Sequence, residues 1–138
     1  GTAASTAGLP PATVAAFTAA GGQMVVGLMR AGTKIVAGTD TPNAASLHGE
    51  LFTYVQAGMT PYEALRTATV NAAEQLGIEA GEIAPGKLAD LVFVDGDPLQ
   101  DISTTVRVRG VIANGRVFRM ADLLARPATA SSPPASRP

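Results

Sequence analysis

Asp40 is the residue in this sequence best placed to carry out chemistry. It follows the short apolar run KIVAG (34–38) and therefore lies just past the carboxyl end of a predicted buried strand, where α/β folds gather catalytic groups. Metal-assisted hydrolysis needs a carboxylate that takes a proton from an acidified water molecule and returns it to the leaving group. Thr39 and Thr41 flank Asp40 with hydroxyls that would orient this carboxylate. An aspartate after a strand is also common as a simple turn or capping residue, and position alone does not separate these interpretations.

His48 is the only histidine and lies in the first turn of a predicted helix that follows the Asp40 loop. One histidine with one acid nearby does not make a metal site, so a structural role or a substrate contact is favoured over ligation. We take His48 and Thr41 as the candidate substrate contacts. Glu50, two residues further on, either faces solvent or supports the loop.

The elements that position Asp40 begin with an alanine-rich stretch over 11–30. Its apolar residues have near-helical spacing, interrupted by Gly21-Gly22, which predicts two helices or one broken helix. Gly32 stands where a helix of this kind ends. The run 34–38 has no polar alternation, which predicts a parallel strand covered on both faces.

Two further helices are predicted after the loop. The first runs over about 47–57, with Ser46 as a possible cap. The second begins with a capping box, in which the Thr60 hydroxyl and the Glu63 carboxylate cap each other's backbone amides, and it closes at Gly77. Helices alternating with a buried strand indicate an α/β protein.

After residue 77 the pattern changes to short strand-like pieces separated by glycine and proline. Pro85-Gly86 predicts a tight turn and 91–94 a strand, while the alternation over 106–109 predicts a half-exposed strand. Asn114-Gly115 is a strong signal for a two-residue hairpin. The end of the chain offers one short helical turn and then a tail with the composition of disorder.

The order of these motifs resembles the carboxyl-terminal end of the amidohydrolase superfamily, especially its imidazolonepropionase-like and prolidase-like branches. The resemblance covers roughly 30–119, and its most specific part is the pair AGTD and EIAPGKLADLVFVDGDP. It implies an α/β fold made of the last strand-helix units of a (β/α)8 TIM barrel, followed by the carboxyl-terminal part of a small β-sandwich domain. In that family the aspartate of the first motif binds the metal and serves as general base, and this role carries over to Asp40.

The resemblance also implies a division of the chain. Residues 1–10 would be a flexible amino-terminal segment, 11–76 the carboxyl-terminal part of the barrel, 77–120 part of the β-sandwich domain and 121–138 a tail. The activity implied is hydrolysis of a C–N bond in an amide, cyclic amide or dipeptide by metal-activated water. One or two zinc ions are the expected cofactor.

Family members carry an HxH pair and further histidines that this chain, with a single histidine, does not contain. A zinc ion held by Asp40 alone would be bound weakly, because stable catalytic sites use about three protein ligands. Together with Gly1 in place of an initiator methionine, this leads us to expect one segment of a cleaved, split or excerpted enzyme. The expected partner is the amino-terminal segment with the other ligands, and the assembly is expected to be a homo-oligomer. The alternative is a non-catalytic scaffold or interaction domain derived from such an enzyme.

Composition narrows the remaining classes of partner. The formal net charge of the 138 residues is −1 and no basic run occurs, so we expect no nucleic-acid partner. We also expect no segment long enough to span a membrane. Cysteine is absent, which removes disulfides and thiolate ligands, and a cytoplasmic location is the default expectation.

Overall fold

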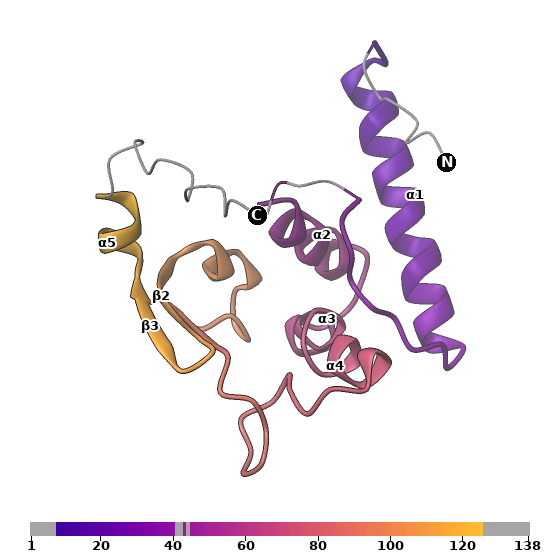
Figure 1. Cartoon of the computed structure of the whole chain (residues 1–138). Coiled ribbons are helices and arrows are strands. Elements are labelled where there is room, and N and C mark those ends of the chain that lie inside the picture. Colours follow the sequence, from indigo (N-terminus) through magenta and orange to yellow (C-terminus); the bar gives the residue numbers. More distant parts are fainter. Residues whose placement is uncertain (1–7, 41–42, 44, 126–138) are drawn as a thin grey trace, which may run out of the picture.

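The computed structural model describes residues 8–40, 43 and 45–125. These form a helical half and a half built around a small sheet (Figure 1). The helices are α1 (Pro11–Arg30), α2 (Ala45–Gln56), α3 (Pro61–Thr67), α4 (Val70–Leu76) and α5 (Met120–Leu124), and η1 (Ile102–Val106) is a 3-10 helix. The strands are β1 (Leu91–Val94), β2 (Val108–Ala113) and β3 (Arg116–Arg119). The mixed α/β content is therefore as expected, while the division into barrel and sandwich parts remains a prediction.

The alanine-rich stretch forms the single long helix α1, which runs past both glycines without a break. Gly22 lies where α1 packs closely against the carboxyl-terminal part of α2, because a Cβ at this position would stand 3.0 Å from the Cβ of Ala57 and 3.2 Å from Cγ2 of Thr53. The helix ends as predicted at Gly32, whose φ of 92° places it in the left-handed region. Gly22 therefore serves helix packing, and the pair does not mark a helix boundary.

By length and composition, α1 is also a helix that could cross a membrane. The expectation that no segment is long enough to do so is wrong for this helix. A core helix of a larger soluble fold passes the same test, and α1 packs one face against α2. The length of α1 therefore leaves the expectation of no membrane partner untested.

The predicted strand over 34–38 is absent. A strand needs a neighbour that completes its hydrogen-bond ladder, and no other described strand lies beside this segment. Its backbone is held instead by the helices: the Ala37 amide donates to the carbonyl of Thr67 at 3.0 Å, and the Asn71 amide side chain donates to the carbonyl of Ile35 at 2.8 Å. The segment is also only partly covered, because Val36 is exposed.

The helix α2 begins two residues before its predicted start, at Ala45, and the capping interaction comes from Asn43 instead of Ser46. The Asn43 side-chain oxygen accepts from the Ala45 amide at 3.0 Å. At the other end, Gly58 has a φ of 112° and terminates the helix. A short polar side chain just before a helix satisfies an amide that has no partner within the helix.

The capping box that opens α3 is confirmed. The Glu63 amide donates to the Thr60 hydroxyl at 3.2 Å, and the Glu63 carboxylate accepts from the Thr60 amide at 2.7 Å. The single helix predicted over 60–76 is wrong, however, because it breaks after Thr67 into α3 and α4. The Thr67 carbonyl accepts from Ala37 in place of an amide one turn later, and the Thr69 hydroxyl bonds the carbonyl of Leu65.

The core lies between the two halves. The 3-10 helix η1 contributes Ile102, the turn between α2 and α3 contributes Met59, and α1, α2 and α3 contribute the rest; its buried members are Val26, Leu51, Tyr54, Met59, Ala64 and Ile102. Because α2 contacts both α1 and η1, it is the central element of the molecule (Figure 1). The helix that follows the Asp40 loop is thus firmly anchored.

The sheet is antiparallel in the order β1-β2-β3, with Leu91 opposite Ile112 and Gly110 opposite Arg119. The predicted hairpin is confirmed, since Asn114 and Gly115 have φ values of 48° and 72°, the positive pair that a two-residue turn of this kind requires. The turn at Pro85-Gly86 is also present.

The strand predicted over 106–109 begins only at Val108, because 102–106 form the 3-10 helix η1. The Asp101 carboxylate accepts from the Ser103 amide at 2.9 Å and so caps this helix. The Thr105 hydroxyl donates back to the carbonyl of Ile102 at 2.8 Å. Local side-chain bonds of this sort compete with the strand pairing that alternation predicts.

Candidate active site

Asp40 lies at the end of the segment that leads from α1 to α2. Its side chain is exposed, so the described residues do not enclose it in a cavity. The expected cover on both faces of the preceding run is missing for the same reason that the strand is missing, namely the lack of neighbouring strands. Thr39 is half-buried beside it, while Thr41 lies outside the described residues.

Three hydrogen bonds from three different helical elements fix the backbone that leads to Asp40. In the first, the Asn71 side chain donates to the Ile35 carbonyl, and in the second the Ala37 amide donates to the Thr67 carbonyl. In the third, the Gly38 amide donates to Oε1 of Glu50 on α2 at 3.3 Å. These bonds take the place of a strand ladder, so the position of Asp40 depends on α2, α3 and α4.

Glu50 supports the loop, which was one of the two alternatives for this residue. The same oxygen that accepts from Gly38 also accepts from the hydroxyl of Tyr54, one helical turn further along α2. Tyr54 is buried, and burial raises the pKa of its hydroxyl well above the usual value, helped by the hydrogen bond to Glu50 and by the charge of that carboxylate. Tyr54 therefore remains a neutral donor that holds Glu50 in place.

His48 lies on the opposite side of α2 from Glu50, because residues two apart in an α-helix are separated by about 200°. Its Nδ1 lies 3.1 Å from the hydroxyl oxygen of Thr105 in η1. The Thr105 hydroxyl donates its hydrogen bond to the carbonyl of Ile102. It therefore acts as the acceptor toward His48, so Nδ1 is the protonated ring nitrogen. This contact joins the two halves of the molecule and leaves Nε2 for any contact with a substrate.

A metal site is not complete within the described residues, where no three His, Cys, Asp or Glu side chains come together. The carboxylate of Asp40 is a suitable zinc donor, but a catalytic zinc ion uses about three protein ligands. The residues present therefore fit one ligand position and no more.

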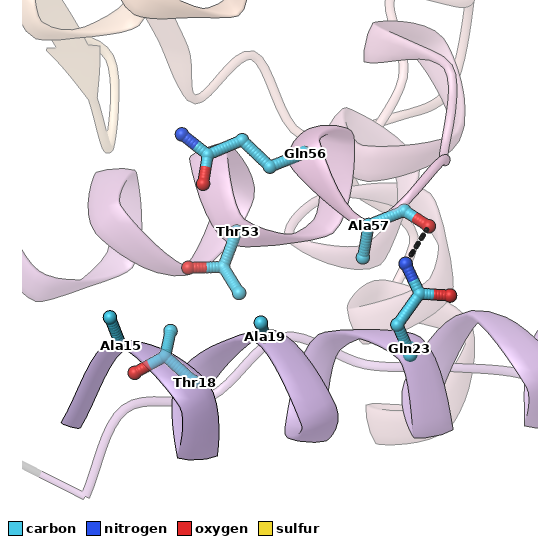
Figure 2. A pocket seen from close by; sticks show the side chains of 7 residues that line it. All are labelled: Ala15, Thr18, Ala19, Gln23, Thr53, Gln56 and Ala57. Carbon is cyan, nitrogen blue, oxygen red and sulfur yellow. Dashed lines mark hydrogen bonds between the residues drawn. The ribbon is translucent and has the colours of Figure 1, made fainter. Parts of the chain in front are cut away.

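A groove of about 260 Å³ lies between α1 and α2 (Figure 2). Its walls come from the alanine, threonine and glutamine side chains Ala15, Thr18, Ala19, Gln23, Thr53, Gln56 and Ala57. The Gln23 side-chain amide donates across it to the carbonyl of Ala57 at 3.1 Å. None of these side chains titrates near neutral pH, so the groove does not offer acid-base chemistry.

Three contributors to the site were not identified from the sequence: the carbonyl of Thr67, the side chain of Asn71 and the two hydrogen bonds that Oε1 of Glu50 accepts. The only available signal was the spacing of Glu50 and Tyr54, since residues four apart on a helix are neighbours. The other two contacts join residues that are about 30 or more apart in sequence.

Comparison with known proteins gives a consistent result. The model of a family described as "Amidohydrolase family" matches residues 18–118. An adenine deaminase of Methanosphaera stadtmanae is 45% identical over 73 residues, covering 52% of this chain and 12% of the relative. An imidazolonepropionase of Deinococcus deserti is 34% identical over 85 residues, covering 57% and 21%.

Among solved structures, a Xaa-Pro dipeptidase with bound methionine in its active site aligns with a TM-score of 0.65 and 32% identity, covering 73% of this chain and 25% of that one. The chain thus spans between about an eighth and a quarter of the length of these relatives. Both motifs, AGTD and EIAPGKLADLVFVDGDP, lie within the matched range. The resemblance inferred from them is confirmed.

Proposed function

Because this chain belongs to the amidohydrolase family, we propose that it is part of a metal-dependent hydrolase that cleaves a C–N bond. The observation that carries the proposal is the position of Asp40. It stands at the end of the AGTD motif, within the matched range, on a backbone fixed by three separate hydrogen bonds. A proton-transfer step requires a positioned carboxylate, and a fixed backbone before Asp40 limits where its side chain can reach.

In the proposed mechanism Asp40 is both a metal ligand and the general base. A divalent metal ion, when bound, makes a water molecule acidic enough to be deprotonated near neutral pH and polarises the scissile carbonyl group. The Asp40 carboxylate takes the proton of the attacking water and passes it to the departing nitrogen. Thr39 orients the carboxylate, and Thr41 and His48 contact the substrate.

The rest of the site comes from a segment that carries the HxH pair and the remaining ligands. Two features support this part of the proposal. Asp40 supplies one ligand where about three are needed, and α1 carries large exposed apolar side chains, including Phe17 at 68% and Met24 at 64% exposure. The missing barrel elements would cover α1 and enclose Asp40.

The proposed substrates are small molecules with an amide or cyclic amide, or dipeptides. The names of the relatives support this range, since they include an adenine deaminase, an imidazolonepropionase and a Xaa-Pro dipeptidase. Neither of the two grooves on the described residues is lined by Asp40, so their walls do not choose between these substrates.

The test is Asp40→Asn in the complete polypeptide that contains these residues. Loss of the base is expected to lower kcat by about 10² to 10⁴-fold, the range that general base catalysis supplies, with the circular dichroism spectrum unchanged. Asp122→Asn, on an exposed face of α5, is the matched control and should keep the wild-type rate. A near-normal rate for Asp40→Asn would remove this residue from the mechanism.

Metal analysis of the same protein separates this proposal from its alternative, a non-catalytic scaffold that retains the hydrolase tail. The enzyme should contain one or two divalent ions per site. A metal-free protein that binds no added zinc and hydrolyses no C–N substrate would support the scaffold and contradict the proposed function.

A further inference from the structure

We infer that Glu50 is a positioning residue that fixes the general base through the backbone of the Asp40 loop, an inference about the reaction that rests on the proposed function. Glu50 itself does not reach the reacting atoms in this argument. Its carboxylate holds the Gly38 amide, and Gly38 precedes Asp40 by only two residues.

The short distance along the chain from Gly38 to Asp40 means that fixing Gly38 also restricts Asp40. Two residues of extended backbone span at most about 7 Å, so a fixed Gly38 amide restricts the Asp40 backbone to a small region. On the other side of Asp40, the Asn43 side chain is bonded to the Ala45 amide at the start of α2. Since Glu50 is also on α2, this one helix holds the loop from both sides.

A second hydrogen bond, from Tyr54, fixes the Glu50 carboxylate that binds the Gly38 amide. A glutamate side chain is flexible, but Oε1 of Glu50 also accepts the hydroxyl proton of Tyr54, which is buried in the core. The Tyr54 hydroxyl can donate only one hydrogen bond, and it donates it to Glu50. The core of the molecule is thereby connected through Tyr54, Glu50 and Gly38 to the loop that carries the base.

A neighbouring bond provides an internal reference. The Ala37 amide donates to the carbonyl of Thr67, a backbone acceptor that no change at Glu50 removes. If Glu50 only stabilised the fold, its loss would lower the protection of both amides from hydrogen exchange. If it holds the loop, its loss should release Gly38 and leave Ala37 protected.

The experiment compares Glu50→Ala, Glu50→Gln and the wild type in the complete, metal-loaded polypeptide. Glu50→Ala is expected to lower kcat per metal-loaded site by about 10 to 100-fold, as removal of a group that orients a metal ligand does, with KM changed less than twofold. Glu50→Gln keeps one side-chain oxygen as acceptor and should recover part of the rate. If Glu50→Ala does not fold, Glu50→Gln carries the test through a smaller loss of kcat.

The matched control is Glu63→Gln. The Glu63 carboxylate also accepts hydrogen bonds, but from the amide and hydroxyl of Thr60 at the start of α3 and not from Gly38. It should lower stability and leave kcat within twofold of wild type. A kcat for Glu50→Ala within twofold of wild type overturns the inference, and so does an equal loss in the control.

Hydrogen exchange, measured by mass spectrometry on a peptide that covers 34–40, gives a readout that needs no substrate. Glu50→Ala should add one rapidly exchanging amide, Gly38, while Ala37 remains slow. Unchanged exchange at Gly38 overturns the inference even in an active enzyme. A wild-type protein without metal or activity contradicts the proposed function instead, and the exchange result still decides whether Glu50 holds the loop.

Discussion

The two adjacent glycines of α1 should respond in opposite directions to the same substitution. Gly21 and Gly22 both lie inside a regular helix, yet a Cβ at Gly21 would meet no atom within 4 Å. At Gly22 the same atom would come within 3.0 Å of the Ala57 Cβ and 3.2 Å of a Thr53 methyl carbon. Gly21→Ala and Gly22→Ala therefore make a matched pair.

The expected size of each effect follows from two opposing contributions. Replacing glycine by alanine in a helix interior stabilises by about 0.5–1 kcal/mol, because the unfolded chain loses conformational freedom. Gly21→Ala should show this gain in full. At Gly22 the added methyl group must push α1 away from α2, and overpacking of this kind costs about 1–3 kcal/mol. Gly22→Ala should therefore be destabilising by up to about 2 kcal/mol.

Urea or thermal unfolding of the polypeptide that carries both helices measures the difference. Gly21→Ala should raise the midpoint and Gly22→Ala should lower it, with the two free energies of unfolding separated by about 1–3 kcal/mol. Equal stabilisation by both substitutions would refute the close approach of α1 and α2 at Gly22. Double substitution should give the sum of the two effects, since only one of the two methyl groups meets α2.

The remaining predictions concern the caps and turns. Thr60→Ala should cost about 1 kcal/mol by removing the capping box of α3. Hydrogen bonds from the Thr60 amide and hydroxyl hold the pKa of the Glu63 carboxyl below its usual value. Their contribution to the free energy of unfolding is complete above that usual value and is lost as the pH falls through the lower, folded-state pKa. In chemical unfolding, the stability difference between Thr60→Ala and wild type should therefore narrow between pH 7 and pH 3. Gly115→Ala should destabilise by about 1 kcal/mol, since Gly115 has a positive φ in the hairpin turn, and a wild-type unfolding midpoint would contradict that turn geometry.

Three kinds of signal that involve neighbouring residues were interpreted correctly from the sequence. The capping box of Thr60 and Glu63, the left-handed ends at Gly32 and Gly77, and the Asn114-Gly115 hairpin all appear in the structure. Each of these features is completed by atoms only a few residues apart. The residue types alone therefore determine them.

Predictions that required a partner far away in the chain were less successful. The run 34–38 is apolar and suited to a strand, but the described residues supply no second strand for it. One continuous helix over 60–76 was also expected, and it breaks because the Thr67 carbonyl bonds Ala37. In both cases the bonding partner is about 30 or more residues away in sequence, as Ala37 is from Thr67 and Ile35 is from Asn71. The spacing of apolar residues gives no sign of such a partner.

The sequence alone also identified the family, because short motifs with a fixed order are readable without coordinates. The role of Asp40 stays a prediction. The sequence left the role of Glu50 open between solvent and the loop. Only the structure placed Oε1 of Glu50 between the Gly38 amide and the Tyr54 hydroxyl.

The amino-acid sequence by itself thus determined the capping box of α3, the hairpin turn and the family, and it predicts the candidate base. Tertiary structure decided how the backbone before Asp40 is held, and which of two adjacent glycines lies against α2. The physical reason is the range of the interactions. Caps and turns are satisfied within about four residues, whereas strand pairing, helix contact and the hold on Gly38 depend on groups that only folding brings together.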